Sequence, residues 1–182
     1  LLTGSKASAY QDIAWIHRLC VFIRDLHERR KPLIGICFGH QLIATALGGR
    51  TVKSDKGWGM GVQSCEFKQS MAGIAAAGER FNIFVSHLDQ VVELPKEAQL
   101  IAGNDFCPVS MMRVDHHILS WQGHPEFSSE LQHELLAIRR EVLSPASWDM
   151  ALSSMNDEPD RDKIARWIMH FLKQGSSPLL VN

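Results

Sequence analysis

The sequence has no marked excess of one charge and no long hydrophobic run. Its 182 residues include 19 Lys and Arg against 20 Asp and Glu, which gives a formal net charge of -1. Because binding of nucleic acid or an anionic membrane draws on a local excess of positive charge, neither is expected as a partner. No apolar stretch approaches the roughly 20 residues that span a bilayer, and no signal peptide opens the chain. We therefore expect a soluble, cytoplasmic protein.

Paired cysteines are also absent. The four cysteines are widely spaced and form no C-x-x-C pair, which argues against a zinc cluster and a disulfide framework. No other set of side chains has the spacing of metal ligands, so we predict neither a metal site nor a cofactor. The length suits one domain. Because the chain opens at Leu1 without Met, in residues typical of a strand end, we expect a single domain over residues 1–182 that lacks an N-terminal segment.

Hydrophobic periodicity predicts alternating helices and strands. Apolar residues between Ile13 and Leu26 recur at helical spacing, and this helix should end before Pro32. The apolar run 33–37 is typical of a buried strand, and residues 39–47 predict a helix. Further strands are predicted at 61–67, 81–85, 99–102, 109–114 and 117–122, several with antiparallel alternation, and further helices from 128 and around 164–171. This order indicates an α/β fold, with residues 144–159 as a surface connection.

The segment Gly35-Ile36-Cys37-Phe38-Gly39 lies at the predicted strand-to-helix junction and has the spacing of a nucleophile elbow, with Cys in place of Ser. Glycines suit both outer positions because side chains there would clash in so sharp a turn. The turn should raise the sulfur above the carboxyl end of the strand, where the next helix N-terminus favours thiolate. We predict that Cys37 is a nucleophile and that the other cysteines, Cys20, Cys65 and Cys107, fill the core.

A candidate base follows the last predicted strand, in Gln122-Gly123-His124-Pro125-Glu126-Phe127. Pro125 favours an extended backbone before it, so residues two apart point the same way and Glu126 can hold the imidazole of His124. Cys37, His124 and Glu126 would then act as nucleophile, base and orienting group. His87 also follows a strand. It would either line the same face of the sheet or cap nearby backbone, and the sequence leaves both readings open.

The two motifs resemble those of class I (triad) glutamine amidotransferases, and most of all stand-alone members related to the amidotransferase domain of GMP synthase. The resemblance rests on residues 32–41 and 122–127 and spans most of the chain. It implies a flavodoxin-like, three-layer domain with a mostly parallel sheet plus antiparallel additions, whose first strands are missing here. It also implies that Cys37, His124 and Glu126 form the triad that attacks the side-chain amide of glutamine.

The resemblance further implies how the substrate is held. Gln41 and the pair Ser86-His87 match residues around the glutamine pocket, and the backbone N–H of Phe38 would donate to the oxyanion. A second donor would come from the Gly4-Ser5 turn. Thr3-Gly4-Ser5 departs from the family's oxyanion loop, which is usually richer in glycine and often carries proline.

Three functions are compatible with these residues. The first is hydrolysis of glutamine through a Cys37 γ-glutamyl thioester, which releases glutamate and ammonia. The sequence has no G-x-x-x-x-G-K-[ST] loop, so a separate synthetase subunit would take the ammonia. The second is a stand-alone hydrolase of γ-glutamyl peptides or amides. The third is a catalytically silent regulatory or binding module, against which the three intact candidate residues argue.

Overall fold

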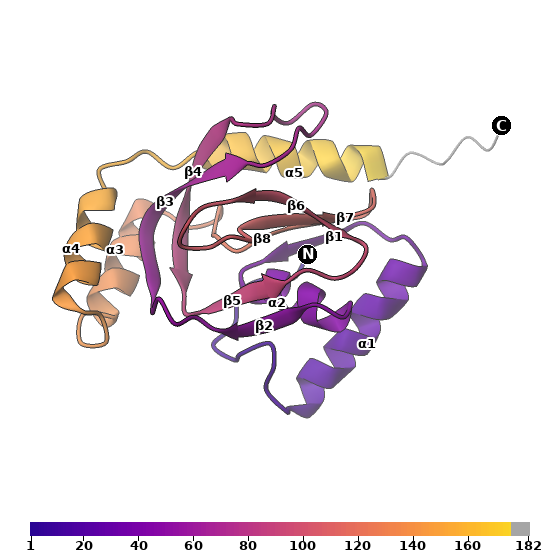
Figure 1. Ribbon diagram of the computed structural model, residues 1–182, viewed down its shortest axis with the longest axis horizontal. Coiled ribbons are helices and arrows are strands. Elements are labelled where there is room, and N and C mark those ends of the chain that lie inside the picture. The colour runs from indigo at the N-terminus through magenta and orange to yellow at the C-terminus, as the bar shows by residue number, and fades with distance from the viewer. Residues whose placement is uncertain (176–182) are drawn as a thin grey trace.

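The computed structural model describes residues 1–175 and is built around a six-stranded sheet in the order β1-β8-β7-β6-β3-β4 (Figure 1). A second sheet pairs β2 with β5. Parallel pairing of β1 with β8 brings the carboxyl ends of both strands to one edge, where Ile36 lies opposite Trp121. In chain order the strands are β1 (Leu33–Ile36), β2 (Arg50–Lys53), β3 (Gly59–Phe67), β4 (Arg80–His87), β5 (Asp89–Glu93), β6 (Ala98–Gly103), β7 (Met111–Val114) and β8 (Ile118–Trp121).

Helices cover both faces of the sheet and confirm the three-layer α/β prediction. The helix α5 (Arg161–Gly175) packs on one face, where Trp167 meets Phe67 and Phe81 edge-on at 5.4 Å between ring centroids. The helices α1 (Ala14–Glu28) and α2 (Phe38–Ala46) cover the other face (Figure 1). A further pair, α3 (Ser129–Ile138) and α4 (Pro145–Ser154), lies beside β3 and β4. The last seven residues of the predicted domain lie outside the described residues.

Parallel pairing is confined to the region around β1. Within residues 1–175, the only parallel contacts of the large sheet are β1 with β8 and the bridge between Leu2 and Gly35, and its other strand pairs are antiparallel. The expected antiparallel additions thus form most of the described sheet, so the prediction of a mostly parallel sheet holds only beside β1. The physical reason is the short connections: β7 and β8 are joined by a turn at residues 115–117, which permits only antiparallel pairing.

The prediction of a surface connection at residues 144–159 was wrong in its central part, which forms α4. Ser144 caps this helix by accepting a hydrogen bond from the Ser147 N–H at 3.1 Å, and Pro145 occupies the first turn, where its missing N–H costs nothing. Of the residues of α4 only Ala151 is buried. Its apolar side chains therefore form no stripe that periodicity could detect. Strands β2 and β5 were not predicted.

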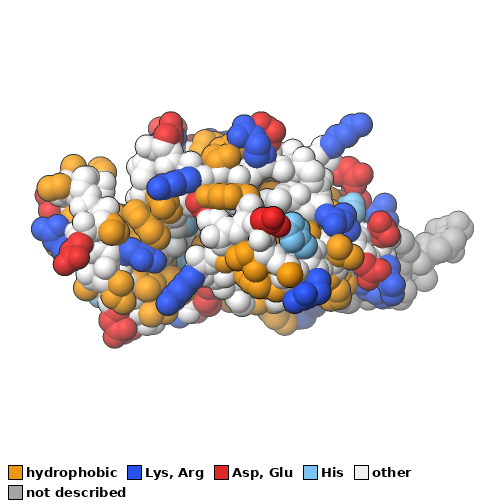
Figure 2. Space-filling view, turned by 90° about the horizontal axis from the view of Figure 1, so that it is seen from below, with side chains coloured by type: hydrophobic (Ala, Val, Ile, Leu, Met, Phe, Trp, Pro, Cys, Tyr) orange, Lys and Arg blue, Asp and Glu red, His pale blue; other side chains and the backbone are white. Residues whose placement is uncertain are grey.

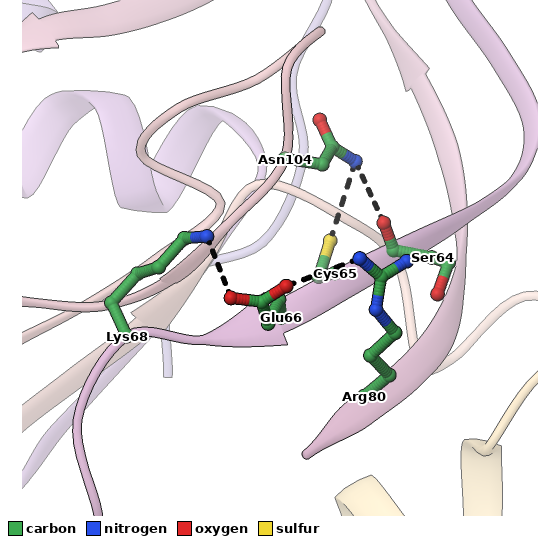
Figure 3. A network of polar contacts seen from close by, with 6 residues as sticks. All are labelled: Ser64, Cys65, Glu66, Lys68, Arg80 and Asn104. Atoms are coloured by element: carbon green, nitrogen blue, oxygen red, sulfur yellow. Dashed lines mark hydrogen bonds and ion pairs between the residues drawn. The ribbon is translucent and has the colours of Figure 1, made fainter. Parts of the chain in front are cut away.

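Asn104, in the loop between β6 and β7, connects that loop to β3 (Figure 3). Its Nδ2 donates to the carbonyl oxygen of Ser64 at 3.1 Å, and its Oδ1 accepts from the backbone N–H of Cys107 at 2.7 Å. Beside it, Glu66 forms ion pairs with Lys68 and Arg80 on the exposed side of β3 and β4 (Figure 3). Asn104 thus satisfies backbone groups of two segments that do not pair as strands.

The surface shows no concentration of one charge on the face drawn in Figure 2. Hydrophobic side chains there alternate with Lys and Arg and with Asp and Glu, as the balanced composition predicts. Within residues 1–175 no helix combines the length and the apolar character needed to cross a membrane.

Candidate active site

Cys37 occupies a strained turn between β1 and α2. Its backbone angles are φ 52° and ψ -103°, a conformation that residues other than glycine rarely adopt. Its N–H donates to the carbonyl oxygen of Trp121 at 2.8 Å. A Cβ atom added to Gly35 would lie 2.6 Å from the side chain of Ile43 and 2.9 Å from the backbone of Gly39. Glycine is therefore required at this position of the turn, as the sequence motif predicts.

Gly39 is required for a different reason, which is the approach of the chain's first residues. Leu2 pairs beside β1: its N–H donates to the carbonyl oxygen of Ile34 at 2.8 Å, and its own carbonyl oxygen accepts from Ile36 at 2.9 Å. A Cβ atom on Gly39 would lie 2.5 Å from that Leu2 oxygen. The same pairing leads Gly4 to His124, because a Cβ atom on Gly4 would lie 3.3 Å from the imidazole Cε1. The Thr3-Gly4-Ser5 segment thus lies at the site.

His124 is held by backbone and side-chain contacts together. Its N–H donates to the carbonyl oxygen of Phe84 in β4 at 2.7 Å, which Gly123 permits because any side chain there would collide with β4. Its Nδ1 lies 2.7 Å from Oε1 of Glu126. The His124 side chain is 5% exposed and that of Glu126 is 47% exposed. The carboxylate therefore orients the buried ring from the solvent side.

The protonation of His124 reflects a balance of opposing effects. Burial lowers the pKa of the imidazole, but hydrogen bonds with Cys37 and Glu126 outweigh burial and raise the pKa to about 9. The ring is thus protonated at neutral pH. A protonated imidazole can give its proton to a leaving group. The arrangement can therefore support attack by sulfur and transfer of a proton.

A cavity of about 440 Å³ opens beside Cys37. This volume lies within the range of small-molecule sites. Five residues predicted at the site line this cavity besides Cys37: Ser5, Phe38, Gln41, Ser86 and His87. Gly4 is not a lining residue and lies against His124 instead. The side-chain amide nitrogen of Gln41, Nε2, already donates two hydrogen bonds. Its acceptors are the carbonyl oxygen of Asp89 at 2.9 Å and Oε1 of Gln122 at 3.0 Å.

His87 combines the two readings that the sequence left open. It ends β4 and lines the cavity, and its Nδ1 also hydrogen-bonds to the backbone oxygen of Asp89 at 3.1 Å. Its Nε2 is buried and has no hydrogen-bond partner among residues 1–175. Burial is the main cause that lowers the pKa of His87 to about 4. The ring is therefore neutral near the site and adds no charge to it.

The buried His40 lies in the first turn of α2 and joins this helix to the sheet. Its ring hydrogen-bonds to the hydroxyl of Ser120 at 2.8 Å and to the carbonyl oxygen of Val109 at 3.0 Å. Burial is the main cause that lowers the pKa of His40 to about 3, so this ring is neutral and structural. The three cysteines expected in the core, Cys20, Cys65 and Cys107, are all buried, and burial raises the pKa of the Cys65 thiol to about 11 and that of Cys107 to about 12.

Several residues at the site were not predicted as site residues. Gln122 places its Nε2 3.7 Å from the sulfur of Cys37, and Asp89, Trp58 and Arg139 are among the other residues that line the cavity. A signal existed for Gln122, which shares an extended segment with His124. Trp58 and Arg139 lie in segments without a motif, and only the fold brings them to Cys37. In the described part of the chain, no group of three or more His, Cys, Asp or Glu side chains is arranged to hold a metal ion.

The sequence is similar to a known protein family and to individual known proteins. Residues 8–140 match the family model described as glutamine amidotransferase class-I. Gamma-glutamyl peptidase 3 of Arabidopsis thaliana is 32% identical over 182 residues, which cover 95% of this chain and 73% of that protein. The glutamine-hydrolyzing GMP synthase of Psychrobacter arcticus is 32% identical over 108 residues, which cover 58% of this chain and 20% of the synthase.

A solved structure has the same fold. The glutamine amido transferase from Methylobacillus flagellatus superposes with a TM-score of 0.78 at 24% identity, covering 94% of this chain and 74% of its own. The flavodoxin-like α/β arrangement expected from the sequence is thereby confirmed.

Proposed function

Because the chain belongs to the class I glutamine amidotransferase family, we propose that it is a thiol hydrolase that cleaves the γ-amide bond of glutamine or of another γ-glutamyl compound. The observation that carries the proposal is the arrangement of three groups. A cysteine in a strained elbow follows β1, a buried histidine follows the paired strand β8, and a carboxylate 2.7 Å away orients that histidine. One relative is named as a gamma-glutamyl peptidase and the other as a glutamine-hydrolyzing synthase. The substrates that both names indicate contain a γ-glutamyl amide bond.

In the first half of the reaction, the Cys37 thiolate attacks the γ-carbonyl carbon of the substrate and the carbonyl becomes an oxyanion. The N–H of Phe38, in the first turn of α2, has no partner within its helix and can donate to this oxygen. The Gly4-Ser5 backbone would supply a second donor, and one such donor is typically worth on the order of 10²–10³ in rate. His124 gives its proton to the departing nitrogen. The carbon–nitrogen bond breaks, and a γ-glutamyl thioester remains on Cys37.

In the second half, a water molecule attacks the thioester and His124 takes a proton from it. The carbon–sulfur bond breaks, which releases glutamate and restores the Cys37 thiolate and the protonated His124. Glu126 holds the ring throughout. When the substrate is glutamine, the other product is ammonia, which a separate synthetase subunit can accept. When the substrate is a γ-glutamyl peptide, the other product is the shortened peptide and no partner is needed.

Turnover by the purified protein tests the proposal. We expect glutamate release from glutamine or from γ-glutamyl dipeptides, complete loss of release in Cys37→Ala, and loss in His124→Ala, with both variants folded as judged by circular dichroism. Cys20→Ala is the matched control because Cys20 is also a buried cysteine but belongs to α1. Release that persists in Cys37→Ala would refute the mechanism. An inactive but folded wild type that still binds glutamate would favour the silent binding module.

A further inference from the structure

The cavity beside Cys37 contains an arginine that no acidic side chain balances. Arg139 directly follows α3 and lines the cavity. Among the described residues it takes part in no ion pair, and its buried Nε has no hydrogen-bond partner there. A cation lining a cavity without a partner in its own chain is suited to an anion that arrives with the ligand.

Trp58 fixes the position of this guanidinium group. The guanidinium carbon lies 4.2 Å from the centroid of the Trp58 ring, and Trp58 lines the same cavity. Stacking on the indole contributes about 0.5–1 kcal/mol at an exposed site and more where water is excluded. Because an indole ring does not neutralise a cation, the guanidinium keeps a charge that an anion in the cavity can pair with.

The other two charged side chains of the cavity have opposite charges. They are Lys6 and Asp89. The Asp89 carboxylate accepts a hydrogen bond from the hydroxyl of Tyr10 at 3.1 Å, and Lys6 is exposed. His87, which also lines the cavity, is held neutral by burial. Lys6 and Asp89 offset each other, so Arg139 is the charge of these side chains that a substrate carboxylate would neutralise.

We propose that Arg139, stacked on Trp58, binds a carboxylate of the substrate and thereby determines substrate selectivity. The inference rests on the proposed hydrolysis of γ-glutamyl compounds. A carboxylate offers two oxygens in the plane that matches the paired N–H groups of a guanidinium. A γ-glutamyl peptide has two such groups, the α-carboxylate of its glutamyl part and the terminal carboxylate of its leaving part. Arg139 is assigned to binding, and the bond-breaking steps remain with Cys37 and His124.

The neighbouring Arg140 provides a matched control. It follows Arg139 directly and also stacks on a tryptophan, with its guanidinium carbon 4.7 Å from the ring centroid of Trp148, but it does not line the cavity. The variants Arg139→Gln and Arg140→Gln therefore remove the same charge and the same kind of stacking from adjacent positions. Steady-state kinetics of both variants and the wild type are measured with glutamine, γ-glutamylglycine and γ-glutamylglycinamide, of which only γ-glutamylglycine has a carboxylate on its leaving part.

We expect Arg139→Gln to raise KM by about 10- to 100-fold, which corresponds to one lost charge-assisted hydrogen-bonded pair, with a much smaller change in kcat. Arg139→Lys should restore part of the loss because it keeps the charge without the planar fork. A rise in KM for γ-glutamylglycine alone identifies the terminal carboxylate as the bound group. A rise for all three substrates identifies the glutamyl α-carboxylate. Unchanged KM values, or an equal rise in Arg140→Gln, would overturn the inference.

Calorimetric titration of inactive protein separates this inference from the proposed function. Cys37→Ala is titrated with γ-glutamylglycine, alone and combined with Arg139→Gln. Binding that is lost only in the combined variant supports the role of Arg139 even if the wild type turns over none of the three substrates, a result that would overturn the proposed function alone. Equal affinity of the two proteins, or no binding by either, contradicts the role of Arg139.

Discussion

The ring of Phe127 lies parallel to the imidazole of His124, with 3.9 Å between the ring centroids and an interplanar angle of 12°. Phe127 thus covers one face of the histidine while Glu126 bonds its edge at Nδ1. A ring held by contacts at one face and at one edge keeps a single orientation. One short segment after β8 therefore supplies the histidine and both groups that fix it.

The raised pKa of His124 makes the activity sensitive to alkaline pH. The imidazole keeps its proton up to about pH 9, so kcat/KM should fall as the pH rises through that value and the proton for the leaving nitrogen is lost. The same shift, upward from 6.5, stabilises the fold; this contribution is complete below 6.5 and is lost as the pH rises through about 9.

Replacing the carboxylate tests the cause of that pKa. Glu126→Gln removes one of the groups that raise the pKa of His124, so the alkaline limb of the profile should move to lower pH and kcat should fall. Profiles of kcat/KM against pH for the wild type and Glu126→Gln provide the measurement. An alkaline limb that stays in place would show that Glu126 does not set the protonation of His124.

The backbone strain at Cys37 should appear as a difference in stability between two substitutions at this position. A residue with a side chain at φ 52° and ψ -103° costs on the order of 1–3 kcal/mol, and glycine avoids most of this cost. Cys37→Gly should therefore be more stable than Cys37→Ala by about 1 kcal/mol or more, although both are inactive. Urea denaturation of the two variants measures the difference.

The same pair of substitutions at Cys20 is the control. Cys20 lies inside α1, where glycine is about 1 kcal/mol less favourable than alanine, so the order of stabilities should be reversed. If glycine were the less stable substitution at both positions, the elbow would carry no strain.

A methyl group at Gly39 should displace the segment that precedes α1. The added Cβ atom would lie 2.5 Å from the Leu2 carbonyl oxygen, so Gly39→Ala must break the pairing of Leu2 with β1. We expect a loss of stability of about 1–3 kcal/mol and a fall in kcat, because Gly4 and Ser5 move away from Cys37. Thermal unfolding and steady-state kinetics test both effects.

Gly48→Ala separates loss of stability from loss of the site. Gly48 has φ +92°, which strains any side chain, but no other atom lies within 4 Å of its added Cβ. This variant should lose stability and keep its kcat. A Gly39→Ala variant with the kinetics of Gly48→Ala would refute a role of the first residues in catalysis.

Asn104 should matter more than its position in a loop suggests. Asn104→Ala leaves the backbone N–H of buried Cys107 and the carbonyl of Ser64 without their side-chain partners, at a cost of about 1–3 kcal/mol. Asn156→Ala, which removes an exposed amide bonded to Ser153, should change stability by less than about 0.5 kcal/mol. Urea denaturation compares the two, and equal effects would contradict the connecting role of Asn104.

The sequence allowed prediction of those parts of the fold that have a regular hydrophobic period or a motif. The stripe from Ile13 to Leu26 predicted α1, and the paired glycines around Cys37 predicted the turn at the end of β1; the structure contains both. The prediction for residues 144–159 failed because the helix there begins with a capping serine and a proline, while most of its apolar side chains remain exposed.

Residues at the site were predictable only where they belong to a motif. Cys37 and His124 could be named because their neighbours constrain the backbone. Trp58 and Arg139 could not, since one precedes β3 and the other directly follows α3, and their contact depends on how these elements pack. Residues that only the packing of separate elements brings to a site are therefore harder to predict from a sequence than residues within a motif.

The pairing of β1 with β8 also determines when in folding the site can form. Gln122 and Cys37, which it brings together, are 85 residues apart in the chain, so closing this contact carries a large loop entropy and contributes to slow folding. We expect Cys37 and His124 to meet late in folding, after the strands between them have been ordered. Recovery of hydrolytic activity during refolding would thus mark one of the last steps of the process, and partly folded chains would carry an unassembled thiol.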